Sequence, residues 1–173
     1  FGEPDEKSFM HKVGGSEEYL VRQLLGLAEV GPAYRVAVAG AQGLAAAHPE
    51  LAAAGIAVAE PDFASHNRVR RVVGESTWLR RHAAGVALVH HGGGTAPPRA
   101  GQPYVLTIND LQFRTYPEYF TRLKRAYLGA LIPRSVHRAA VVAVPSDYVR
   151  ESVIEACRAD PERVLVVPHG IEP

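Results

Sequence analysis

The stretch Pro103-Tyr-Val-Leu-Thr-Ile-Asn-Asp-Leu-Gln-Phe-Arg-Thr-Tyr-Pro117 decides the fold. It begins with an apolar run of β-forming residues and becomes polar at Asn109 and Asp110. A short apolar run between a proline and polar residues predicts a strand that is buried on both faces. Ligands of open α/β sheets bind just beyond the carboxyl ends of the strands, so Asn109 and Asp110 become candidate site residues.

Short apolar runs and helical patterns alternate along the chain on both sides of this stretch. Strands are also predicted at 36–39, 56–59, 86–91, 141–144 and 164–167. Helices are predicted between them, at 17–30, 44–54, 67–83, 117–137 and 147–159. Because none of the strands has a polar face, the alternation predicts an α/β fold, a Rossmann-like parallel sheet with helices on both faces.

The predicted helix over 117–137 has a proline in its first turn and an apolar side at helical spacing. That apolar side consists of Tyr119, Phe120, Leu123, Tyr127, Leu128 and Leu131. An apolar side of this kind normally identifies the part of a helix that faces a core.

The composition is that of a globular protein. At 173 residues, with 47% apolar and 21% charged residues, the chain is long enough for one well-buried domain. Nineteen Lys and Arg against eighteen Asp and Glu leave a formal charge of +1, so nothing indicates nucleic-acid binding. The single cysteine, Cys157, excludes an intrachain disulfide and fits a reducing compartment such as the cytoplasm. No apolar run approaches the length of a membrane span.

Gly14 and Gly15 stand directly before a predicted helix with Ser16 as its N-cap. Free backbone N–H groups and missing side chains at a helix start would admit a phosphate. A tight turn explains the two glycines as well, and Glu17 and Glu18 offset part of the positive helix end. Both interpretations stay open from these residues alone.

His90 and His91 end a predicted strand. Either imidazole could act as a base, donate a hydrogen bond to a sugar or phosphate, or bind a metal. Adjacent strand residues point to opposite faces, so at most one faces the site and the pair is a poor chelate. Without a metal-binding motif elsewhere, we expect no metal. A histidine that caps loop carbonyls is the alternative interpretation.

Asp110 and Ser146 also have simple structural explanations. Asp110 could orient a ligand, or accept backbone N–H groups of the turn after the strand. Ser146 directly before Asp147 is an ordinary helix cap. The chain contains no Gly-x-Ser-x-Gly, Walker or Gly-x-Gly-x-x-Gly motif, which argues against a hydrolase, a nucleoside triphosphatase and a dehydrogenase.

Several short motifs, taken in their order and spacing, resemble one enzyme family. They are Gly14-Gly-Ser-Glu-Glu-Tyr19, Thr107-Ile-Asn-Asp-Leu111, Arg138-Ala-Ala140, Val144-Pro-Ser146 and Val166-Val-Pro-His-Gly-Ile171. From about residue 13 to the end, the chain resembles the N-terminal domain of retaining GT-B glycosyltransferases of the family 4-like type, also called glycosyl transferases group 1. This resemblance implies one half of a GT-B fold.

The resemblance implies transfer of a sugar from a nucleotide-sugar donor to an acceptor, with retention of configuration and without a cofactor or metal. It places the donor diphosphate at Gly14 and Gly15. It implies that His90 or His91 contacts the transferred sugar or the acceptor as the catalytic residue.

The acceptor side would include Asn109, Asp110 and Ser146 by the same resemblance. Asn109 stands where the family has His, which removes a titratable group and keeps hydrogen bonding. The sequence 168–170 is Pro-His-Gly where the family usually has Pro-Asn-Gly. A role in proton transfer is therefore not expected at residue 109.

The resemblance also implies how the domains are organised. Residues 1–12 are expected to be a flexible lead-in and residues 13–173 the acceptor-side domain, while the donor-binding C-terminal domain is absent. Because the chain begins with Phe1 and lacks that domain, we expect a segment of a longer enzyme that is inactive alone. The acceptor could be a sugar, a lipid-linked molecule or a small molecule, in the cytoplasm or at the inner face of the membrane.

Two alternatives remain from the sequence. One is another GT-B or sugar-nucleotide enzyme, such as an epimerase. The other is a non-catalytic nucleotide- or carbohydrate-binding module, for which Asn109 is the motivating residue. Turnover by the full-length protein would exclude the binding module, whereas UDP or GDP binding without transfer would favour the other enzyme.

Overall fold

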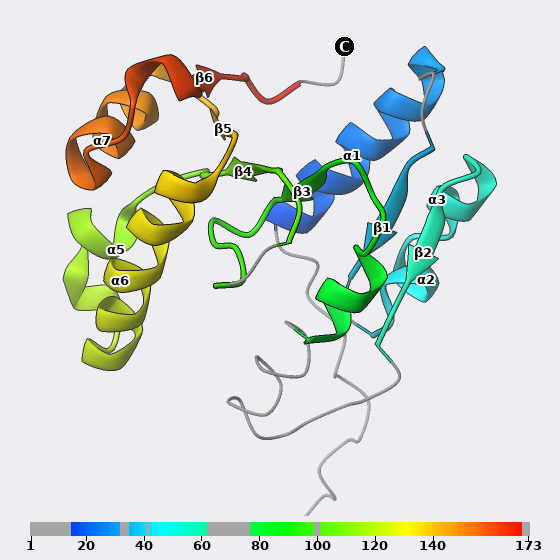
Figure 1. Ribbon diagram of the computed structural model, residues 1–173, viewed down its shortest axis with the longest axis horizontal. Helices are drawn as coiled ribbons and strands as arrows, with labels where there is room; N and C mark the ends of the chain where they lie inside the picture. The colour runs from blue at the N-terminus through cyan, green and yellow to red at the C-terminus, as the bar shows by residue number, and fades with distance from the viewer. Residues whose placement is uncertain (1–14, 32–34, 41, 62–76, 99–100, 171–173) are drawn as a thin grey trace, which may run out of the picture.

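The computed structural model describes residues 15–31, 35–40, 42–61, 77–98 and 101–170 (Figure 1). The elements are α1 (Gly15–Val30), β1 (Ala37–Ala39), α2 (Leu44–Ala47), α3 (Pro49–Ala53), β2 (Ala57–Ala59), β3 (Val89–His91), β4 (Tyr104–Thr107), α5 (Gln112–Thr115), η1 (Pro117–Tyr119), α6 (Arg122–Arg138), β5 (Val141–Val144), α7 (Asp147–Cys157), η2 (Pro161–Arg163) and β6 (Val164–Val166). Residues 77–82 are also helical. The predicted lead-in, Gly14 and the first part of the helix predicted at 67–83 lie outside the described residues.

Every strand pair in the described residues is parallel, which confirms the predicted α/β class. The strands form two sheets rather than the one predicted sheet. One has the order β1-β2 and the other the order β3-β4-β5-β6. Within the described residues, no strand pairing joins β1 to β3. Figure 1 shows the two-stranded sheet with α1 to α3 at one end of the molecule and α5 to α7 at the other.

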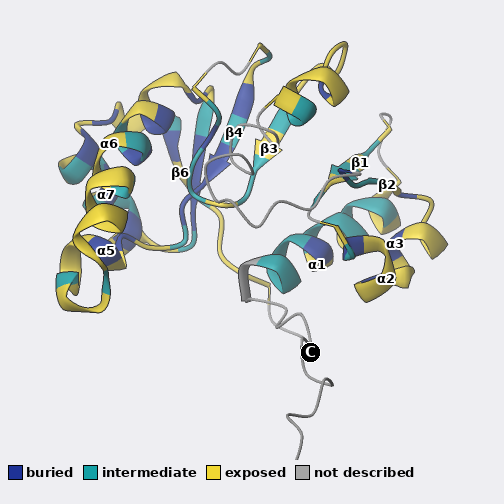
Figure 2. Cartoon of the chain, turned by 90° about the horizontal axis from the view of Figure 1, so that it is seen from below, coloured by how far each residue is buried: buried dark blue, intermediate teal, exposed yellow. Residues whose placement is uncertain are grey.

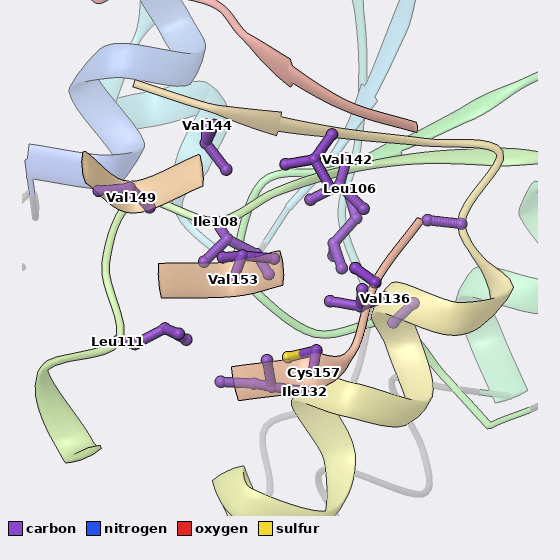
Figure 3. Packing of buried hydrophobic residues seen from close by; sticks show 14 of the residues in the cluster. Leu106, Ile108, Leu111, Ile132, Val136, Val142, Val144, Val149, Val153 and Cys157 are labelled. Atoms are coloured by element: carbon purple, nitrogen blue, oxygen red, sulfur yellow. The ribbon is translucent and has the colours of Figure 1, made fainter. Parts of the chain in front are cut away.

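The four-stranded sheet carries the larger core (Figure 3). Leu106 and Ile108, from β4 and the residue after it, pack with Val142 and Val144 of β5 against α6 and α7. Leu106 is fully buried and Thr107, on the other face of β4, is 2% exposed. The prediction that this strand is buried on both faces is thus confirmed.

A second, smaller cluster lies between α1, α3 and the two-stranded sheet. Only Val21, Leu51 and Ile56 are its buried members, and partly buried side chains of α1, β1 and β2 surround them. In Figure 2 this end of the molecule is mainly exposed or intermediate. The strands here are too rich in alanine to bury much apolar area.

Several predicted element boundaries were wrong for local reasons. The helix predicted at 44–54 is two short helices, because Pro49 forces the preceding His48 out of helical geometry, to φ −130° and ψ 67°. The strand predicted at 86–91 begins only at Val89, since its partner β4 begins at Tyr104. Helix α1 begins at Gly15, so Ser16 lies inside the helix rather than at its N-cap.

The prediction of a helix at 117–137 was also wrong about where the helix begins and about which of its residues are buried. A 3₁₀ turn at Pro117–Tyr119 comes first, and α6 begins after Thr121, whose side chain accepts the N–H of Lys124 at 3.2 Å. The residues that α6 buries are Ile132, Ser135 and Val136. Of the predicted apolar side, Tyr119, Leu123 and Tyr127 are exposed.

Candidate functional site

The carboxyl ends of β3, β4, β5 and β6 lie at one edge of the sheet, because all four strands are parallel. The residues that follow or end these strands are therefore brought to one rim, namely His90 and His91, Asn109 and Asp110, Ser146, and 168–170. This rim is the candidate functional site.

Helix α1 lies against the same rim through two contacts. The Tyr19 ring stacks on the His169 ring, with centroids 4.0 Å apart and planes at 27°. A Cβ on Gly92, just after β3, would lie 2.3 Å from Cδ1 of Leu20, so a larger residue there would force the Leu20 side chain to shift. The first residue of α1, Gly15, is consequently held near the rim, and Gly14 lies outside the described residues.

His90 is oriented by the neighbouring strand. Its Nε2 lies 2.7 Å from Oγ1 of Thr107, a hydroxyl that is almost fully buried. Although His90 is exposed, the protein around its ring lowers its pKa by desolvation. A neutral imidazole has one donor and one acceptor nitrogen, and Thr107 occupies one of them. The other nitrogen can bond a ligand hydroxyl.

His91 points to the opposite face, as predicted for adjacent strand residues. Its ring meets the edge of the Tyr104 ring, with centroids 5.2 Å apart and planes at 78°. The Tyr104 hydroxyl donates to the carbonyl of Ser135 in α6 at 2.7 Å. Burial, and secondarily the charge of His90, lower the pKa of His91. His91 therefore packs towards the helical layer, and His90 is the better placed of the two for a ligand.

Asp110 and Ser146 have local backbone partners. Oδ1 of Asp110 accepts the N–H of Gln112 at 3.0 Å, at the start of α5. Oγ of Ser146 accepts the N–H of Val149 at 3.4 Å, as the N-cap of α7. Asn109 lies half-buried between Ile108 and Asp110. The structure thus shows that Asp110 accepts a backbone N–H of the turn after the strand and that Ser146 caps α7, the structural explanations that the sequence offered.

His48 is a buried residue that the sequence analysis did not select. Its Nδ1 lies 2.9 Å from Glu50 and its Nε2 3.2 Å from Glu17, in the first turn of α1. The hydrogen bond to Glu50, more than that to Glu17, raises the pKa of His48 against the effect of burial. The signal in the sequence was the His-Pro pair that interrupts the predicted helix at 44–54.

The carboxylates in the first turn of α1 thus have basic side chains as partners. Glu17 faces the His48 imidazole, and Glu18 accepts Nε of Arg22 at 2.8 Å. The sequence analysis treated these two glutamates as opposing an anion at the helix start. Because each has a basic partner, they weaken the positive end of α1 less than predicted.

Glu60, which follows β2, was also missed. Its carboxylate accepts the N–H groups of Gly43 at 3.0 Å and Ala45 at 2.6 Å. These two bonds lower its pKa. Glu60 therefore fixes the start of α2 and is not available as a base.

In the described part of the chain, no three His, Cys, Asp or Glu side chains are grouped so that they could hold a metal ion. Among the same residues, no helix is both long and apolar enough to cross a membrane. Cys157 is buried, and burial raises the pKa of its thiol.

One family model and several solved structures match the chain. The sequence model of Glycosyltransferase Family 4 matches residues 13–173. The fold is similar to Anabaena Alr3699/HepE in complex with UDP and glucose, with a TM-score of 0.63 and 16% identity over 93% of this chain and 42% of that chain. The same protein in complex with UDP gives a TM-score of 0.61 and 18% identity, again over 93% and 42%.

A glycosyltransferase from Rickettsia africae ESF-5 has a TM-score of 0.54 and 15% identity, over 92% of this chain and 41% of that chain. The chain thus spans about two fifths of the length of these structures. No curated protein matches it.

Proposed function

The chain belongs to Glycosyltransferase Family 4, and from this membership we propose that it forms the acceptor-side domain of a retaining glycosyltransferase. The enzyme would move a sugar from a nucleotide-sugar donor to an acceptor. The observation that carries the proposal is the family match over residues 13–173, which includes every residue of the rim.

We propose that the donor is a nucleoside diphosphate sugar. Its support is the shared fold with Anabaena Alr3699/HepE, which was crystallised with UDP and with glucose. The start of α1, at Gly15, would receive the diphosphate, since its free N–H groups and the helix dipole favour an anion. The basic partners of Glu17 and Glu18 support this role, because they reduce repulsion of the phosphates.

His90 would contact the transferred sugar or the acceptor. Thr107 holds its ring in place, and the lowered pKa keeps the imidazole neutral near pH 7, so the free nitrogen bonds a hydroxyl without adding charge. Transfer with retention requires stabilisation of an oxocarbenium-like centre and of the departing diphosphate. We assign stabilisation of the departing diphosphate to the start of α1, without a metal ion. EDTA should therefore leave the transfer rate unchanged.

The proposal also covers the rest of the enzyme and its acceptor. A second α/β domain would supply most donor contacts, because this chain spans about two fifths of the similar structures. The chain alone would then be inactive. Asn109, Asp110 and Ser146 would border the acceptor, which is a sugar, a lipid-linked molecule or a small molecule in the cytoplasm.

The test is donor turnover by the protein at its native length. Release of nucleoside diphosphate from UDP-, GDP- and ADP-sugars would be measured with candidate acceptors, and the anomeric configuration of the product by NMR. We expect His90→Ala to lower kcat/KM by about 100-fold. His82→Ala is the control, because His82 is an exposed histidine on the helix at 77–82 and its ring contacts Trp78 of the same helix.

An inverted product would contradict retention, and an unchanged rate for His90→Ala would contradict the role of His90. A non-catalytic binding module is the second candidate, favoured by Asn109 where the family has His. Binding of UDP without turnover of any donor would support that module. Conversion of the donor to its epimer would instead identify an epimerase.

A further inference from the structure

The segment from α5 to the first half of α6 is a basic and aromatic lobe, defined here as residues 112–127. Four of the chain's nineteen Lys and Arg lie in it, and one of the eighteen Asp and Glu. The lobe therefore has a formal charge of +3, whereas the whole chain has +1. It projects from the end of the molecule opposite β1 and β2 (Figure 1), and Figure 2 shows much of its surface exposed.

The lobe exposes large apolar side chains that a helix would normally bury. Tyr119 is 80% exposed and Leu123 is 82% exposed, and Tyr116 and Tyr127 are about half exposed. Of the predicted apolar side, Phe120 and Leu128 pack partly buried against the core, and the fully buried residues of α6 are Ile132, Ser135 and Val136. Tyr119, Leu123 and Tyr127 therefore remain as exposed apolar side chains of the lobe.

Three arginines of the lobe share one groove. Arg114 of α5 and Arg122 and Arg125 of α6 line an open cavity of about 460 Å³, with Phe113 and Ala126 as its apolar lining. Arg114 donates to the carbonyl of Ala156 at 3.1 Å, which fixes it to α7. Within the described residues, the side chains of Arg122 and Arg125 form no hydrogen bond or ion pair.

The positions of these charges oppose local stability. Arg122, Lys124 and Arg125 occupy the first turn of α6, which contains no acidic residue. Cations in the first turn are repelled by the positive end of the helix, and like charges spaced i, i+3 repel one another. Such an arrangement is expected where an external anion supplies the missing countercharge.

We propose that the lobe docks on an anionic membrane surface, with the arginine groove holding a lipid headgroup phosphate. Tyrosines prefer the membrane–water interface, and Arg and Lys extend from there to headgroup phosphates. A segment that combines exposed apolar side chains with cations of one sign binds anionic lipid surfaces. An acidic protein is less well matched, because the exposed tyrosines and Leu123 surround the cations with apolar area.

The test is co-sedimentation of the native-length protein with vesicles of phosphatidylcholine alone or with about 25% phosphatidylglycerol. We expect binding only to the anionic vesicles and loss of binding at about 500 mM salt. The triple variant Arg122→Gln, Lys124→Gln, Arg125→Gln should bind about 100-fold more weakly, since each basic side chain contributes about fivefold. Tyr119→Ser with Leu123→Ser should bind about tenfold more weakly.

The matched control is Arg35→Gln, Arg80→Gln, Arg81→Gln, which removes three exposed charges outside the lobe. It should bind within twofold of wild type. Thermal unfolding checks that every variant is folded, which is expected because all these side chains are exposed.

Absence of binding to anionic vesicles would overturn the proposal. A loss of vesicle binding in the Arg35, Arg80, Arg81 control variant as large as that in the lobe variant would also overturn it. Glycerol phosphate that abolishes vesicle binding at low millimolar concentration would indicate a soluble phosphate ligand instead of a bilayer. Binding that depends on the charges but not on Tyr119 and Leu123 would contradict the apolar contribution. Vesicle binding requires no turnover, so this test is independent of the proposed transferase activity.

Discussion

The two sheets of this molecule have unequal cores. Among the described residues, the four-stranded sheet and its helices bury sixteen apolar residues in one cluster, whereas the two-stranded sheet buries three. The stacked and packed contacts of α1 with the rim, through Tyr19 and Leu20, connect these two regions. In the proposed enzyme, the sugar-contacting His90 thus belongs to the rigid region, and the phosphate-binding start of α1 to the weaker one.

The largest expected effect tests whether the core of the four-stranded sheet contributes more stability than the core of the two-stranded sheet. Leu106 and Leu51 are both fully buried leucines, one in each core. We expect Leu106→Ala to lower the free energy of unfolding by about 3–4 kcal/mol and Leu51→Ala by about 2 kcal/mol, because the smaller cluster relaxes more easily around a cavity. Urea unfolding followed by circular dichroism measures both values. An equal or larger loss for Leu51→Ala would refute the comparison.

The second prediction concerns the contact between the regions. Gly92→Ala should cost about 1–2 kcal/mol, because the new Cβ would meet the Leu20 side chain and displace α1 from the rim. Gly93→Ala is the control, since a Cβ there has no neighbour within 4 Å. Chemical denaturation of both variants gives the comparison. Equal stability of the two would mean that α1 is not held at Gly92.

The third prediction separates capping from acceptor binding at Ser146. Ser146→Ala should lower the unfolding free energy by about 1 kcal/mol, because α7 loses its N-cap, and Ser146→Asp should restore most of it. Stability is measured by thermal unfolding and transfer activity in parallel. If Ser146→Asp keeps stability but reduces acceptor use, Ser146 also borders the acceptor. Full activity in this variant would limit Ser146 to capping.

The smallest expected effect is the pH dependence of the two-stranded region. The pKa of His48 is raised by Glu50 and Glu17, so its contribution to stability is complete below the unfolded value near 6.5. That contribution is lost as pH rises through the raised folded value. The pKa of Glu50 is lowered, so its contribution is lost as pH falls below its usual value.

Hydrogen exchange of α1 and α3 amides measures this effect. Relative to His48→Gln, the wild-type amides should be better protected near pH 6 than near pH 8.5, with little change in α7. A protection difference that grows with rising pH would contradict the sign of the His48 contribution.

The predicted fold agrees with the observed fold for features that depend only on residues close together in the sequence. The apolar run that contains Tyr104 and Leu106 could be placed because burial on both faces leaves no polar position. The opposite directions of His90 and His91 followed from strand geometry alone. The capping alternatives for Asp110 and Ser146 were visible because such contacts span only two or three residues.

Features that depend on distant residues could not be predicted. The partners of His48 are Glu17 and Glu50, and the former lies thirty-one positions away. The exposure of Tyr119 and Leu123 depends on where α6 leaves the core, although their spacing predicts a buried helix side.

By itself, the sequence determined the parallel α/β class and the set of residues at the strand ends, because side-chain period and turn chemistry are local properties. Only the tertiary structure decided that His90 rather than His91 is exposed at the rim, that Glu17 and Glu18 have basic partners, and that Tyr119 and Leu123 are left exposed. Each of these depends on which neighbours packing brings within a few ångströms, and a sequence does not specify those neighbours locally.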